Sequence, residues 1–278
     1  MKRRVVVGAL VVVGVAVAVW MSVRPTNQRT WITQQATLPA ARIDGHIAHV
    51  TSVRNFHYTG ENTFVPAYDD RTYDLDKLVS ASFILTPFSK AWRGPAHTFV
   101  TFGFSDSQFV SISVEARREQ GETYAPLTGL FKQFELIYVI GDERDLIGQR
   151  AAFGTSPVYL YPIRAPRERI REVFVEMLQR ADGLREHPEF YNTLTNNCTS
   201  NLIAHVNHVA AHRISGGLKT ILPGYSDEVA YQLGLIDTDL DLAHARARFQ
   251  INERARRFAQ DSLFSFRIRE TSTARSGG

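Results

Sequence analysis

The sequence predicts an α+β protein preceded by one transmembrane helix. Three observations lead to this prediction. Alternating and β-branched runs lie in the middle of the 278-residue chain, helical periodicity appears mainly after residue 165, and nineteen uncharged residues follow the basic N-terminus. Strands that come first and helices that come late define the α+β class.

The uncharged N-terminal segment runs from Val5 to Val23. As a helix it is about 28 Å long, close to one bilayer core. The apolar region of a signal peptide is shorter, about 7–15 residues, and ends in a small-x-small cleavage site. No such site ends this segment, and no cysteine stands directly after it as in a lipoprotein signal. We therefore expect residues 1–23 to be an uncleaved membrane anchor, with cleavage as the alternative.

The basic residues of the N-terminus predict the orientation of this anchor. Lys2, Arg3 and Arg4 precede the span, which favours an N-terminus inside the cell, and Trp20 lies where an interfacial aromatic is expected. The rest of the chain would then face the periplasm of a bacterium. The expected location is the inner membrane, with a single pass.

Composition excludes several classes of protein. Hydrophobic residues make up 44% and charged residues 22%, which is typical of a packed domain and not of a disordered chain or a polytopic membrane protein. A net charge of +4 gives no reason to expect nucleic-acid binding. The single cysteine, Cys198, excludes an internal disulfide and a cysteine-rich zinc site. We expect no cofactor.

The strands are predicted from alternation and β-branched content. Residues 24–40 are predicted to be a weakly packed linker, and residues 41–265 the periplasmic domain. The strand segments are 43–58 (a strand or half a hairpin), 97–104, 109–117, 134–141 and 158–163. A turn at 105–107 joins the second and third of these into a β-hairpin.

The helices are predicted from apolar spacing. One begins near Pro166 and ends at Gly183, and another begins near Cys198. Two more are expected over 226–235 and 240–260, in a helical C-terminal extension that starts at about residue 216. Residues 266–278 are expected to be a disordered tail.

Cys198 is the best candidate for chemistry. In the first turn of a helix, the positive end of the helix dipole favours a thiolate, and free N–H groups there can receive an oxyanion. His97 opens an apolar strand and is the best candidate for the base. In the predicted hairpin, paired positions sum to about 212. That places residue 97 opposite Glu115, so Glu115 or Ser113 would orient the imidazole.

Simpler interpretations compete with this one. A lone cysteine is often an inert core residue, a strand histidine is often structural, and Glu115 stands among other charged residues at a strand end. His205, His208 and His212 lie on one helix face, which has the spacing of a metal site, but a solvated histidine face or capping contacts are favoured and no metal is expected. The arginine-rich stretches 164–171 and 246–257 are polar helix faces or contacts with anionic lipid headgroups.

Several separated blocks resemble the Lnb N-terminal periplasmic domain family. They are Val53–Tyr58, Tyr73–Leu78, His97–Phe104, Ser111–Glu119, Phe134–Ile140 and Phe190–Ser200. The resemblance implies a permuted papain-like (NlpC-like) fold, a central antiparallel sheet flanked by helices. It further implies Cys198 as nucleophile and His97 as base. The Asn-Cys pair is similar to that of the lecithin:retinol acyltransferase group, so Asn197 and Asn196 would support the oxyanion.

The expected function is therefore cysteine-dependent acyl transfer through a thioester. The substrate would be a membrane lipid or a lipoprotein, because the anchor holds the site near the bilayer. The Lnb protein itself has further spans after this domain, which leaves hydrolysis or another acceptor open. The alternatives are a cysteine peptidase or amidase acting on cell-envelope peptide, and a non-catalytic envelope binding or assembly protein.

Overall fold

The predicted strands form part of one eight-stranded sheet, together with strands over 68–74 and 78–87 that were not predicted, in a computed structural model of the protein, which describes residues 2–89, 92–209, 213–214 and 222–270. The strand order is β1-β2-β9-β8-β7-β6-β10, and β5 pairs with β2. These strands are β1 (Ala40–Asp44), β2 (Ile47–Arg54), β5 (Tyr68–Asp74), β6 (Leu78–Pro87), β7 (Ala96–Phe104), β8 (Phe109–Arg117), β9 (Glu135–Gly141) and β10 (Tyr159–Pro162). A separate two-stranded ribbon joins β3 (His57–Tyr58) and β4 (Phe64–Val65).

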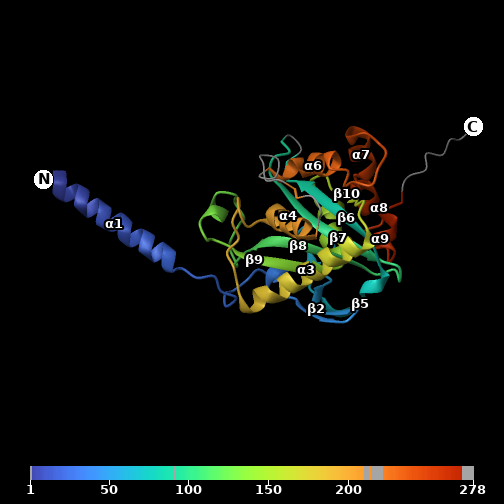
Figure 1. The fold of residues 1–278 in the computed structure, drawn as a ribbon, viewed down its shortest axis with the longest axis horizontal. Helices are drawn as coiled ribbons and strands as arrows, with labels where there is room; N and C mark the ends of the chain where they lie inside the picture. Colours follow the sequence, from blue (N-terminus) through green and yellow to red (C-terminus); the bar gives the residue numbers. More distant parts are fainter. Residues whose placement is uncertain (1, 90–91, 210–212, 215–221, 271–278) are drawn as a thin grey trace, which may run out of the picture.

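Helices cover both faces of the sheet, which confirms the α+β class (Figure 1). One face packs against α3 (Arg167–Glu186) and α4 (Cys198–Val209). The other packs against α2 (Glu143–Gly148), the π-turn Gln149–Phe153, α8 (Asn252–Arg257) and α9 (Phe264–Arg267). The remaining helices α6 (Ser226–Gln232) and α7 (Leu242–Phe249) lie beside the β6–β10 edge.

The predicted hairpin forms with the predicted register. β7 and β8 are antiparallel, and their pairs from Phe99–Ser113 to Gly103–Phe109 all sum to 212. The sheet is mixed, however, because β2 runs parallel to β9 at Arg54 and Gly141. The expectation of an antiparallel sheet is thus wrong at this one position, where a long connection brings β9 beside β2.

Two predicted helices differ from the observed ones: one continues past its predicted end, and the other is interrupted. Gly183 does not stop α3, because Leu184 one residue later is buried in the core and holds the helix to Glu186. The helix expected over 240–260 is broken after Phe249. There Gln250 takes an extended conformation and bridges β10, and the N–H of Ile251 donates to the carbonyl of Val158.

The expected linker is packed against the domain. Trp31 and Gln35 are buried, and the Arg117 guanidinium lies 4.2 Å from the Trp31 ring and donates to the carbonyls of Gln35 and Ala36. Residues 26–36 are therefore part of the folded unit. At the other end, the start of the expected tail is ordered as well, since α9 extends into it and Ile268 is buried. Residues 271–278 lie outside the described residues.

The N-terminal helix α1 (Lys2–Ser22) projects away from the domain (Figure 1). In the part of the chain that the structure describes, no helix has both the length and the apolar character needed to cross a bilayer. The membrane anchor expected over residues 5–23 stays a prediction.

Candidate active site

The sheet splits between β7 and β8 at the end where β7 begins. Their pairing stops at Phe99 and Ser113, whereas β7 stays paired with β6 and β8 with β9 beyond that point. His97 and Glu115 are therefore not paired by backbone hydrogen bonds between β7 and β8, as the predicted register required. A cavity of about 360 Å³ lies at the split, and His97, Glu115 and Cys198 all line it. The sequence-predicted residues thus come together in one cavity.

His97, Ser113 and Glu115 form a chain of hydrogen bonds. The His97 Nε2 atom lies 2.7 Å from the Ser113 hydroxyl, and that hydroxyl donates to Glu115 Oε1 over 2.9 Å. Because the hydroxyl proton is used toward the carboxylate, Ser113 accepts the hydrogen bond from His97, and Nε2 carries the ring proton. The neutral ring then presents Nδ1 as its proton acceptor. Ser113 and Glu115, the two candidates for the residue that orients His97, are thus both part of this chain: Ser113 contacts the ring and Glu115 contacts Ser113.

Glu115 is held by two further side chains. Arg150, from the π-turn, pairs with Oε1 at 2.9 Å, and Gln35 donates to Oε2 at 2.9 Å. Burial alone raises the pKa of this carboxyl, but the Arg150 charge and then His97 outweigh it and hold the pKa of Glu115 well below its usual range. Glu115 is therefore a fixed anion, and not a charge on a solvated strand end.

The imidazole of His97 is neutral at ordinary pH. Its side chain is 11% exposed, and burial, with the nearby Arg150 charge, lowers the pKa of His97 to about 3 against the opposing effect of Glu115. The ring also stacks on Phe99, with centroids 5.5 Å apart. The neutral ring is free to accept a proton, but a pKa this low makes it a weak base in the free protein, since an efficient general base has a pKa near the operating pH.

Cys198 is the first residue of α4, as predicted, and Asn197 caps this helix. The Asn197 Oδ1 accepts from the Ser200 N–H at 2.9 Å, while the Ser200 hydroxyl accepts from the Asn197 N–H at 2.8 Å. This reciprocal pair is a capping box. It fixes the start of the helix and leaves the N–H groups of Cys198 and Thr199 without an intrahelical acceptor. These two backbone donors can receive an oxyanion.

The side chains of Asn196 and Asn197 serve the helix start and not the cavity. The Asn196 amide donates to the Phe190 carbonyl, and the Asn197 amide donates to the Thr193 carbonyl. Both side-chain donors are thus engaged by local backbone. Their contribution to the site is to position Cys198.

A buried threonine pair joins the two halves of the site. Thr98 follows His97 and Thr199 follows Cys198, and their hydroxyls lie 3.0 Å apart. Within the described residues no hydrogen bond joins the thiol to the imidazole, and the Cys198 Sγ contacts the Thr199 hydroxyl at 3.8 Å. Such pairs are often long in free enzymes and tighten when substrate binds.

Sequence reasoning assigned no role to the other polar and aromatic residues of the cavity. They are Arg150 and Gln35, the aromatic residues Phe88, Tyr124 and Tyr191, and Arg118. No local pattern marks them, because they come from loops, a π-turn and the segment expected to be a linker. Their place in the site depends on tertiary packing.

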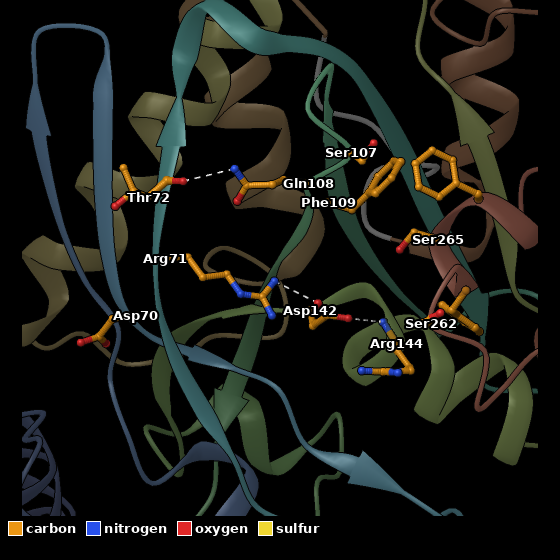
Figure 2. A pocket seen from close by; sticks show the side chains of 12 residues that line it. Asp70, Arg71, Thr72, Ser107, Gln108, Phe109, Asp142, Arg144, Ser262 and Ser265 are labelled. Atoms are coloured by element: carbon orange, nitrogen blue, oxygen red, sulfur yellow. Dashed lines mark hydrogen bonds and ion pairs between the residues drawn. The ribbon is translucent and has the colours of Figure 1, made fainter.

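A second cavity, of about 480 Å³, lies at the opposite end of β8, where Phe109 begins the strand (Figure 2). Arg71 crosses it and pairs with Asp142 at 2.9 Å, and the Gln108 amide donates to the Thr72 carbonyl. It is polar and larger than the Cys198 cavity. We place the chemistry at Cys198 because this second cavity has no thiol or imidazole in its lining.

The predicted histidine face is used for local contacts. His205 is buried and lies 2.7 Å from the Tyr138 hydroxyl, and His208 pairs with Glu176 at 2.8 Å. His212 lies outside the described residues. Among those described, a different group, His46, Asp74 and Asp76, lies close enough to hold a cation, but Lys77 and Arg171 already pair with its carboxylates.

The fold and site define the class of protein: an α+β domain with a cysteine at a helix start, facing a histidine–serine–glutamate chain. The chain belongs to the Lnb N-terminal periplasmic domain family, whose model matches residues 64–223 and so includes every residue of that set. The family identifies a periplasmic, envelope-associated protein. No curated protein and no solved structure matches the chain.

Proposed function

We propose that this protein is a cysteine-dependent acyl-transfer enzyme of the bacterial envelope, acting on lipid or lipoprotein acyl groups. The observation that carries the proposal is the cavity that Cys198 shares with the His97–Ser113–Glu115 chain. A nucleophile, a base and a group that orients the base are the three parts needed for covalent catalysis of this kind.

The reaction has two halves. In the first, His97 Nδ1 takes the thiol proton and the Cys198 sulfur attacks an ester or amide carbonyl. The N–H groups of Cys198 and Thr199 stabilise the oxyanion, and His97 returns the proton to the leaving alcohol or amine. In the second, an amine or water gives its proton to His97 and attacks the thioester; the carbon–sulfur bond breaks, and His97 returns the proton to the leaving Cys198 sulfur, which restores the free thiol.

The proposal extends to fold and location. A cysteine that begins a helix packed on a sheet, with its histidine on a strand earlier in the chain, fits a permuted papain-like arrangement. Residues 5–23 would anchor the domain in the inner membrane with a single pass, with the domain in the periplasm. The side chains of α1 support this, because Leu10, Val12 and most of their neighbours are exposed apolar groups.

The test is mass spectrometry of the full-length protein after exposure to bacterial membrane lipids. We expect an acyl adduct on Cys198, which is the single thiol of the chain. Cys198→Ala should carry none, and His97→Gln should form it about 10²–10⁴-fold more slowly. The matched control is His208→Gln, an exposed histidine remote from the cavity. If lipids leave Cys198 unmodified but envelope peptides acylate it, the peptidase or amidase alternative is correct.

One observation favours a second candidate, a non-catalytic envelope binding protein. The thiol and imidazole share a cavity but no hydrogen bond joins them within the described residues. Under this alternative Cys198→Ala retains full function in cells and no substrate modifies the thiol.

A further inference from the structure

Two loops contribute to the lining of the Cys198 cavity. The first joins β6 to β7, and its described residues are 88–89 and 92–95; the second, residues 118–134, joins β8 to β9. Phe88 of the first loop and Tyr124 of the second both line the cavity. A surface that covers Phe88 and Tyr124 therefore lies against the cavity that contains Cys198.

Both loops expose large apolar side chains. The exposed fractions are 53% for Phe88, 55% for Trp92, 73% for Leu127 and 67% for Phe131. Leu194, 52% exposed, lies beside the second loop, where the N–H of neighbouring Thr193 donates to the Gly129 carbonyl. We call these five side chains the rim. Scattered surface apolar residues are ordinary, but large apolar side chains exposed on and beside two loops that line one cavity point to an interaction surface.

The second loop is also tied to the end of α1. The Lys132 ammonium donates to the carbonyls of Trp20 and Val23, at 3.1 and 3.3 Å, and lies 4.5 Å from the Trp20 ring. Tryptophan at the end of an apolar helix is typical of the headgroup level of a bilayer. The contact with Lys132 therefore places Leu127 and Phe131 near that same level.

We propose that the rim inserts into the surface of a phospholipid bilayer, so that the Cys198 cavity opens directly toward lipid. The proposal rests on the anchoring by α1 given under the proposed function. A lipid surface fits better than a protein partner because the rim continues from α1 and because Lys132 supplies a cation for lipid phosphates. Acyl groups would then reach the thiol without crossing water.

The experiment measures the depth of spin labels on the full-length protein in vesicles of phosphatidylethanolamine and phosphatidylglycerol. Single cysteines replace Phe88, Leu127 and Phe131, one at a time, in a Cys198→Ser background. The matched control is Val65→Cys, on β4 outside the rim, whose native side chain is 63% exposed. Rim labels should collide more often with oxygen than with a water-soluble nickel complex, and the control label should show the inverse ratio.

Two results would overturn the inference: rim labels as accessible to nickel as the control, or rim labels shielded from both reagents, which indicates a protein interface. A label at Val12 separates this result from the anchor. Oxygen exposure at Val12 with water-exposed rim labels keeps the anchor and refutes the docking surface. Water exposure at Val12 with lipid-exposed rim labels refutes the anchor and keeps the docking surface.

Discussion

The Ser113 hydroxyl lies 2.7 Å from Nε2 of His97 and donates its own hydrogen bond to Oε1 of Glu115. Removing it by Ser113→Ala leaves the imidazole without its acceptor, so the ring loses its fixed tautomer and orientation. We expect adduct formation at Cys198 to slow by about 10–100-fold, less than the loss expected for His97→Gln. The rate is measured by mass spectrometry over time.

The same strand offers a matched control for this change. Ser111 lies two residues earlier, is equally buried, and its hydroxyl has no hydrogen-bond partner among the described residues. Ser111→Ala should leave the rate within about twofold, since no hydrogen bond is lost. Equal rates for the two alanine variants would mean that Ser113 does not orient His97.

Arg150 is expected to support Glu115 through their ion pair. Arg150→Gln removes the charge that holds the pKa of Glu115 low and leaves a partly buried carboxylate less compensated. We expect a loss of about 1–3 kcal/mol in the free energy of unfolding, measured with urea. The control is Arg164→Gln, whose pair with Asp237 is exposed and should contribute less than about 1 kcal/mol. A similar small loss for both variants would contradict this role.

His97 predicts a pH dependence of stability. In the folded protein the pKa of His97 is about 3, against about 6.5 for an exposed histidine, so between these limits the unfolded chain binds a proton that the folded protein does not. The free energy of unfolding should therefore rise with pH in this window, by about 1.4 kcal/mol per pH unit from this residue.

The measurement compares urea unfolding of the wild type and of His97→Gln at pH 5 and 6. In this interval the variant should lack that part of the slope. Glu115 adds a slope of the same sign, but at lower pH, because its pKa is also depressed. If the two proteins lose stability equally between pH 6 and 5, the imidazole of His97 is not buried in neutral form.

The local parts of this site follow from the sequence, and the tertiary parts do not. Apolar alternation predicts β7 and β8, the turn between them sets the register, and the polar cap before Cys198 places it at a helix start. The split of the sheet is not local. It arises because β7 keeps its pairing with β6 while β8 keeps its pairing with β9.

The two residues that hold Glu115 could not be predicted from the sequence either. Arg150 comes from a π-turn and Gln35 from a segment whose polar composition suggested a linker. Composition does not indicate that Arg117 binds that segment to the sheet. Fully buried arginines are uncommon, and this one is stabilised by hydrogen bonds to the carbonyls of Gln35 and Ala36, which only the folded chain brings to it. The parallel contact of β2 with β9 is likewise set by packing over a long sequence separation.

The Thr98–Thr199 hydrogen bond should set the distance between the two catalytic groups. Thr199→Val keeps the shape of the side chain but leaves the buried Thr98 hydroxyl unpaired, which costs about 1–3 kcal/mol of the free energy of unfolding. The double variant Thr98→Val with Thr199→Val removes both hydroxyls and should recover most of this stability, because no polar group is then left without a partner. Thr128→Val, which loses an exposed hydrogen bond to Ala125, serves as the control and should cost less than about 1 kcal/mol. If the double variant recovers stability and still forms the Cys198 adduct at the wild-type rate, apolar packing alone positions β7 against α4. A slow double variant of normal stability would assign the positioning to the threonine hydroxyls, through their mutual hydrogen bond or through the Thr199 contact with the Cys198 sulfur.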